Sequence, residues 1–252
     1  MSLFLTLTFL FCIGSSAGWI LEVFFRRFYS KSNPERRWIN PGFLTGPWIP
    51  LYGFGLCLLY LLAGLERYFV FDGWLAKAIL FLIMAICMTA IEYLAGIISI
   101  KLLKVRLWDY SNEWGNIDGI ICPLFSAFWA VLGAIYYFFI HPNVLDALRW
   151  LSENLAFSFV IGLYFGVFLV DVFHSCNILA KIKSFAEENK ITVRYDRLRK
   201  IMLRAIEERK NRKIFFLPIH YNSAITEQLK DYNERLKNQT IDLNESKNST
   251  IK

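Results

Sequence analysis

Five long apolar runs constrain this chain more than any other feature. They occupy residues 3–25, 42–64, 78–100, 120–141 and 155–175. A helix of about 20 apolar residues crosses the hydrocarbon core of a bilayer. Because backbone polar groups in lipid must be paired within the protein, spanning segments of this kind are helices. The pattern predicts an all-α, multi-pass membrane protein of about five transmembrane helices.

Composition supports this class and limits the chemistry. Hydrophobic residues make up 56% of the chain and charged residues only 19%, unlike a typical soluble domain. The first run lacks a basic segment before it and is long enough to span, so we interpret it as a retained helix rather than a signal peptide. The five cysteines form no C-x-x-C motif and are interpreted as small core residues. We expect no metal and no other cofactor.

The distribution of basic residues predicts the orientation of the chain. The connections after the first and third runs are basic, and 17 of the 28 Lys and Arg residues follow Ser175. Since basic segments stay in the cytoplasm, we expect the N-terminus outside and the C-terminus inside. The net charge of +7 fits this topology and attraction to anionic lipid. No nucleic-acid-binding motif is present.

The same features divide the chain into three parts. We expect a transmembrane domain over residues 1–178. A cytoplasmic basic region over 179–237 has apolar residues at helical spacing, which predicts an amphipathic helical tail on the membrane surface or on a partner. Residues 238–252 are polar and predicted to be disordered.

Two glutamates lie within apolar runs, where a carboxylate is costly and usually has a partner or a function. Glu22 shares a helix face with Trp19, but it also lies one turn before Arg26 and could simply pair with it. Glu92 lies deeper in its run and is the best single candidate for function. The alternative is a buried packing group held by an ion pair or hydrogen bonds.

The second run is rich in residues that disturb a helix. Proline removes a backbone donor and glycine loosens the helix, and the first half of this run contains Gly42, Gly46, Pro47, Pro50 and Gly53. Broken helices of this kind line substrate sites in many transporters. A kinked helix that packs closely through its glycines is an equally good interpretation.

A weak internal repeat is visible. Glu22 is followed by Asn40–Gly42 and an apolar run, and Glu92 is followed by Asn116–Gly119 and another apolar run. The pattern predicts two parallel two-helix repeats plus a fifth helix, with the two carboxylates facing each other across a pseudo-twofold axis.

Asp171 and His174 lie three residues apart near the end of the last run. They could form a proton relay or half of a metal site, although a hydrogen-bonded pair at the helix end is the more common arrangement.

Several short blocks resemble the bacterial family of putative ABC-transporter permeases, type IV. The blocks are Gly18–Glu22 (GWILE), Asn40–Pro47 (NPGFLTGP), Pro50–Gly55 (PLYGFG), Glu92–Gly96 (EYLAG), Trp108–Ser111 (WDYS) and Asn116–Gly119 (NIDG). The resemblance implies a multi-pass protein of the bacterial plasma membrane, surrounded by the lipid bilayer.

Together with the features above, the blocks define a set of candidate residues lining a cavity. These residues are Trp19, Glu22, Asn40, Gly42, Gly46, Pro47, Pro50, Tyr52, Gly53, Glu92, Tyr93, Trp108, Asp109, Tyr110, Asn116 and Gly119. Neither the blocks nor the rest of the sequence identifies a catalytic residue.

Three functions remain open. The first is a permease-like subunit whose ATPase is a separate chain, because no GxxxxGK[ST] phosphate loop is present. A bundle this small would also need a second membrane subunit or a second copy of itself. The second is an intramembrane enzyme that acts on a lipid or lipid-linked substrate, with Glu92 or Glu22 as general base. The third is a non-catalytic assembly factor whose buried carboxylates fix helix packing.

Overall fold

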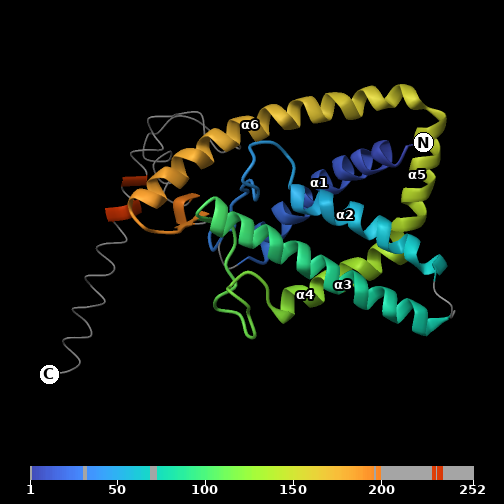
Figure 1. Ribbon diagram of the computed structural model, residues 1–252, viewed down its shortest axis with the longest axis horizontal. Coiled ribbons are helices and arrows are strands. Elements are labelled where there is room, and N and C mark those ends of the chain that lie inside the picture. Colours follow the sequence, from blue (N-terminus) through green and yellow to red (C-terminus); the bar gives the residue numbers. More distant parts are fainter. Residues whose placement is uncertain are drawn as a thin grey trace.

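The computed structural model describes residues 2–30, 33–68, 73–195, 197–199, 229–230 and 232–234, and it is mostly helical (Figure 1). The longer helices are α1 (Leu3–Phe28), α2 (Pro50–Ala63), α3 (Trp74–Ile97), α4 (Pro123–Ile135), α5 (His141–Glu153) and α6 (Ser158–Glu188). Short helical segments are η1 (Gly64–Tyr68), η2 (Ile98–Leu102), η3 (Tyr136–Ile140) and η4 (Leu155–Phe157). Two short strands, β1 (Val105–Arg106) and β2 (Val193–Arg194), pair in parallel.

Four helical stretches are long and apolar enough to cross a membrane. They are Leu3–Phe28, Trp74–Leu102, Pro123–Glu153 and Leu155–Glu188. Each overlaps one of the predicted runs, which confirms the prediction of a multi-pass, helical membrane protein.

The second predicted run does not form a helix of full membrane length. Residues 42–49 are not helical, and α2 begins only at Pro50 and contains 14 residues, which makes it about 21 Å long. Pro50 occupies the first helical turn, where a missing N–H costs no hydrogen bond. The prediction of five transmembrane helices is therefore not confirmed, and the predicted repeat likewise stays a prediction.

Figure 1 shows how the elements are arranged. The helix α2 runs antiparallel to α1, and α3 and α4 lie beside them, whereas α5 crosses one end of the bundle and leads into α6. The loop over residues 29–49, the loop over 103–122 and the end of α6 gather at the opposite end. The three segments predicted to be cytoplasmic thus share one end, while the orientation of the termini across the membrane stays a prediction.

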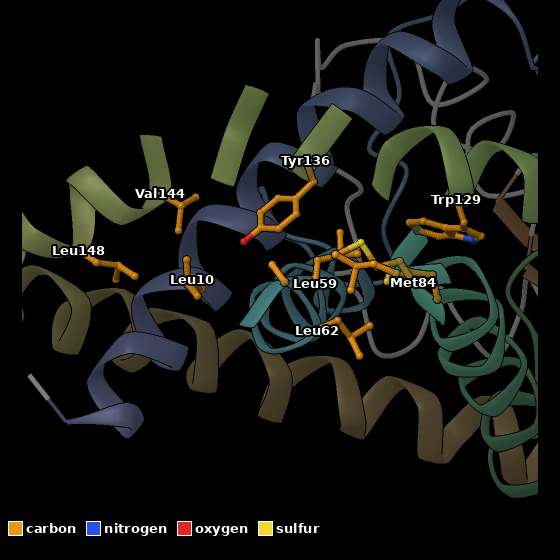
Figure 2. Close-up of a cluster of buried hydrophobic side chains, with 11 residues drawn as sticks. Leu10, Leu59, Leu62, Met84, Trp129, Tyr136, Val144 and Leu148 are labelled. Atoms are coloured by element: carbon orange, nitrogen blue, oxygen red, sulfur yellow. The ribbon is translucent and has the colours of Figure 1, made fainter. Parts of the chain in front are cut away.

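The helices α1 and α2 approach closely through glycines. A Cβ on Gly18 would lie 2.2 Å from the Cβ of Tyr52, and one on Gly53 would lie 2.8 Å from the ring of Phe11. Small residues allow such approach between membrane helices. The main apolar core lies nearby and includes Leu10, Leu59, Met84 and Tyr136 (Figure 2).

The predicted boundary between residues 178 and 179 falls inside α6, which continues without a break to Glu188. Beyond α6, Val193 of β2 packs in a second apolar cluster with Val105 and Ile182. Most of the predicted amphipathic tail and all of the predicted disordered segment, 238–252, lie outside the described residues. The division into domains therefore stays a prediction.

Candidate functional site

Glu92 lies inside the helical bundle. Its side chain projects from α3, and the residue is only 3% exposed. One carboxylate oxygen accepts a 2.8 Å hydrogen bond from the indole N–H of Trp129 on α4, and the other accepts a 3.2 Å bond from the hydroxyl of Tyr110. Both donors are neutral. Within the described part of the chain, no Lys or Arg pairs with this carboxylate.

Glu22 has a different environment. It accepts a 3.1 Å hydrogen bond from the hydroxyl of Tyr52 on α2 and forms a 3.2 Å ion pair with Arg26, one turn further along α1. Its side chain is 23% exposed. The predicted pairing of Glu22 with Arg26 is present, but the carboxylate also points at α2.

Aromatic side chains connect the two glutamates. The rings of Tyr52 and Trp129 lie 5.5 Å apart, and these are the side chains that donate to Glu22 and Glu92. The two carboxylates are near enough to interact electrostatically. We call Glu22, Tyr52, Glu92, Tyr110 and Trp129 the carboxylate cluster. It joins α1, α2, α3, α4 and the loop over residues 103–122.

Tyr110 is the loop residue of this cluster. Burial, followed by the negative charges of Glu92 and Glu22, holds the pKa of its phenol well above the ordinary value. The phenol ring stacks on Phe125 with centroids 4.2 Å apart. Tyr110 therefore keeps its proton near neutral pH and donates a hydrogen bond to Glu92.

Asn40 organises the loop before α2. The Asn40 side-chain oxygen accepts bonds from the indole of Trp19 at 2.8 Å and from the amide of Gly42 at 3.2 Å, and its NH₂ group donates to the carbonyls of Leu44 and Thr45. An amide side chain commonly satisfies loop backbone in this way. Trp19 and Asn40 thus fasten this loop to α1, one turn from Glu22.

Asp171 of α6 fastens the next part of the same loop. Its carboxylate accepts bonds from the amide and hydroxyl of Thr45, from the amide of Gly46 at 2.9 Å and from the indole of Trp48 at 2.7 Å. Ser175 adds a further donor at 3.3 Å. These bonds hold the loop against α6, whereas the predicted relay, metal half-site or hydrogen-bonded pair of Asp171 with His174 stays a prediction.

The loop over residues 103–122 has its own internal bonds. Asn116 donates to the carbonyls of Ser111 and Glu113 and accepts from the amide of Gly119, and the indole of Trp108 donates to the carbonyl of Ile120. Gly119 has φ +66°, a conformation that favours glycine.

The segment after α6 binds both loops. Arg194 forms an ion pair with Asp109, while the hydroxyl of Tyr195 donates to the carbonyl of Gly42 and the buried Arg199 donates to that of Asn40 at 3.3 Å. Burial opposes ionisation of Asp109, but hydrogen bonds from Ser111 and the charges of Arg194 and Arg106 outweigh it and lower the pKa of Asp109.

The structure brings together only part of the predicted site. Glu22, Tyr52, Glu92 and Tyr110 lie in the carboxylate cluster. Other predicted residues build the adjoining loop and the start of α2, namely Asn40, Gly42, Gly46, the exposed Pro47, Pro50 and Gly53, and Trp19 of α1 contacts this loop through Asn40. The second loop contains Trp108, Asp109, Asn116 and Gly119, and Tyr93 of α3 donates to Asp118 of that loop at 2.8 Å.

Sequence reasoning missed Trp129. A tryptophan among the apolar residues of the fourth run gives no sign that its N–H has a specific acceptor. A step of seven residues before Tyr136 would place both side chains on one face. That spacing could have predicted an inward-facing Trp129, but not its bond to Glu92.

The described residues contain no group of three or more His, Cys, Asp or Glu side chains that could hold a metal ion. The cluster instead offers two carboxylates, two phenols and an indole. Such groups can bind a cation, accept or release a proton, or simply hold four helices in register.

The four apolar spans define the chain as a multi-pass, helical membrane protein. Residues 9–176 match the sequence model of a family described as putative ABC-transporter type IV. The match covers more than half of the chain, so the protein belongs to this family. No curated protein and no solved structure matches the chain.

Proposed function

We propose that this chain is a permease-like subunit of a membrane transporter and that the carboxylate cluster is its substrate site. The observation that carries the proposal is the environment of Glu92, a 3% exposed carboxylate held by two neutral donors inside a helical bundle. Ionisable groups within membrane segments commonly mark the path of a substrate or an ion.

The charge of the cluster favours a cationic cargo. Arg26 pairs with Glu22. Of the two glutamates in the cluster, Glu92 is therefore the one that has no cationic partner among the described residues. The rings of Tyr52 and Trp129 lie between the two carboxylates. Carboxylates and aromatic faces both attract cations. A cationic group of a substrate, or a proton, is therefore the ligand that this site would accept.

The end of the bundle that carries the two loops suits a soluble partner. Loop 29–49, loop 103–122 and the segment after α6 are joined by the β1–β2 pair, the Arg194–Asp109 ion pair and the Arg199–Asn40 bond. The Asn40 loop also contacts Trp19, one turn from Glu22. We infer that a separate ATPase docks at this end, which the basic residues assign to the cytoplasm.

A second membrane chain completes the proposal. Large apolar side chains of α3 and α6 remain exposed, such as Leu82, Ile86, Phe159 and Val170, and a bundle this small encloses little space. We expect another copy of the chain or a different membrane subunit beside it.

Copurification and a matched pair of variants test the proposal. Extraction of the tagged, full-length chain from native membranes in mild detergent should recover an ATPase and a membrane subunit. Glu92→Gln keeps the size of the side chain and removes its charge. We expect Glu92→Gln to abolish transport by the recovered complex while its abundance stays near that of the unaltered chain. Failure to recover any ATPase would refute the permease function.

A structural role is the second candidate, because both oxygens of Glu92 already have donors in the fold. In that case Glu92→Gln would lower the abundance of the protein as much as its activity. Measuring both quantities for the same preparation separates the two functions.

A further inference from the structure

We infer that the end of α1 forms a binding site for the phosphate of an anionic phospholipid, made by Arg27 and Trp38. This site is separate from the carboxylate cluster and does not depend on the proposed transport function. The ligand class is a phospholipid with a net negative headgroup in the leaflet that contacts this end of the protein.

The site is built on one face of α1. Phe24 lies three residues before Arg27 and four before Phe28, spacings that make each of them a neighbour of Phe24 on the helix surface. Trp38, from the following loop, packs edge-on against both phenylalanine rings at 5.7 and 6.2 Å. The guanidinium of Arg27 lies 5.3 Å from the centre of the Trp38 ring. We call these four residues the arginine–aromatic patch.

The aromatic side chains of the patch are about half exposed, although they are apolar. Phe24 is 50% exposed, Phe28 54% and Trp38 46%. Trp38 combines a large apolar ring with a polar N–H, and tryptophan concentrates at the headgroup level of membranes for this reason. The rings of Phe24 and Phe28 pack against Trp38 and add apolar surface beside it.

The position of the patch along α1 fits that level. With 26 residues, α1 is about 39 Å long, whereas the hydrocarbon core is about 30 Å thick. The last turn of α1 therefore emerges among the headgroups. Loop 29–49 begins there, at the end of the bundle that the basic residues assign to the cytoplasm.

The charge of Arg27 identifies the ligand. Its neighbours have carboxylate partners, since Arg26 pairs with Glu22 and Arg37 with Glu35. Within the part of the chain that the structure describes, Arg27 forms no ion pair, and its guanidinium lies over the Trp38 ring. A guanidinium that faces an indole in this way can still bind phosphate oxygens through its N–H groups. Lipid phosphates are the anions that are abundant at this depth.

The test compares lipids that remain bound to the purified, full-length protein. The protein is reconstituted into mixed vesicles of phosphatidylcholine and phosphatidylglycerol, extracted in mild detergent and washed, and the retained lipids are quantified by mass spectrometry. For Arg27→Gln we expect the ratio of retained phosphatidylglycerol to phosphatidylcholine to fall about fivefold, as expected for one interfacial arginine. Trp38→Leu should lower the same ratio while keeping the charge of Arg27.

Arg36→Gln is the matched control, because Arg36 is an exposed arginine in the loop that contains Trp38. A change below about twofold is expected for it, as for a diffuse surface charge. Equal losses for Arg27→Gln and Arg36→Gln would overturn the site in favour of a general basic surface. Unchanged retention in Arg27→Gln would overturn it outright.

Two further measurements, a phosphate wash and an Arg27→Lys variant, complete the test. Inorganic phosphate added during washing should not displace the lipid, and full displacement would assign the patch to free phosphate instead. If Arg27→Gln elutes as an aggregate, Arg27→Lys replaces it. Lysine keeps the charge but lacks the planar guanidinium that lies over Trp38 and can bind phosphate through two N–H groups, so we expect an intermediate ratio. A ratio equal to that of the unaltered chain would contradict a role for the guanidinium itself.

Discussion

The α1–α2 pair and the α3–α4 pair each place a glutamate against an aromatic donor, but the two glutamates differ in their surroundings. Glu22 on α1 accepts from Tyr52 on α2, and Glu92 on α3 accepts from Trp129 on α4. Glu22 also has Arg26 and is partly exposed, whereas Glu92 is buried with neutral donors only. The comparison teaches that two similar helix pairs can leave one carboxylate in an ion pair and the other with neutral hydrogen-bond donors only.

The loops that follow α1 and α3 differ in a related way. The first is held from outside, by Asp171 on α6, by Trp19 on α1 and by Arg199. The second is held largely by its own bonds through Asn116, Gly119 and Trp108. A change at Asp171 of α6 should therefore reach the first loop directly.

The largest effect is expected from Asp171→Ala. This change leaves the half-buried donors of Thr45 and Gly46 and the buried indole of Trp48 without their acceptor, and it should lower the free energy of unfolding by about 3 kcal/mol. Thermal unfolding in detergent measures the loss. Trypsin should then cut faster after Arg36 and Arg37, whereas cleavage after Arg106 should not change.

Asp171→Asn serves as the control, because its amide oxygen can still accept part of these bonds. A milder loss than in Asp171→Ala is expected. Equal acceleration of cleavage at both loops would show that the loops are not held independently.

The next prediction compares two close contacts made by glycines, one on α1 and one on α3. An alanine at Gly18 would place its Cβ 2.2 Å from the Cβ of Tyr52, which is attached directly to the backbone of α2. An alanine at Gly96 would meet the Cγ2 methyl of Ile120 at 2.2 Å, the end of a loop side chain that can shift. Gly18→Ala should lower the free energy of unfolding by about 3 kcal/mol, and Gly96→Ala should lower it by about 1 kcal/mol. Unfolding midpoints of the two variants, measured side by side, check the order.

A smaller difference should separate the two aromatic donors. Trp129→Phe removes one of the two donors to Glu92 and should cost about 2 kcal/mol, the value for a hydrogen bond to a charged group. Tyr52→Phe should cost about 1 kcal/mol, because Glu22 keeps its ion pair with Arg26. In Glu92→Gln protein, the cost of Trp129→Phe should shrink, and a double-mutant cycle measures that coupling. An unchanged cost would mean that Trp129 acts through packing alone.

The smallest effect concerns the pH dependence of the second loop. The pKa of Asp109 is lowered in the folded protein, so its carboxylate stabilises the fold above the ordinary aspartate pKa of about 3.9. That contribution is lost as the pH falls through the lower, folded value. The stability that Asp109 contributes should be constant between about pH 7 and 5, because both pH values lie above the ordinary pKa of about 3.9. It should decline only below about pH 4.

Arg194→Gln removes one of the charges that lower this pKa. The acid loss of stability attributable to Asp109 should then be smaller than in the unaltered chain, and it should be complete at a slightly higher pH. Unfolding midpoints measured across the acid range for Arg194→Gln and for the exposed-site control Arg36→Gln distinguish this effect from a general loss of positive charge.

The sequence by itself determined the class of the protein and the position of most of its spans. Apolar runs of membrane length are a local property, so residues 3–25, 78–100, 120–141 and 155–175 could be located without a fold. Glu92 could be predicted as buried for the same reason, because it lies deep within an apolar run. The glycine and proline content of the second run also predicted its irregular start, although not that the helix would be only 14 residues long.

Only the tertiary structure decided which side chains meet. Glu92 and Trp129 are 37 residues apart, Thr45 and Asp171 126, and Asn40 and Arg199 159. Hydropathy and helical periodicity describe which face of a segment is buried, but they carry no information on which distant segment covers it. The partners of Trp129 and Asp171 therefore depend on how the helices pack, since each hydrogen bond forms only once backbones far apart in the sequence have come within a few ångströms of one another.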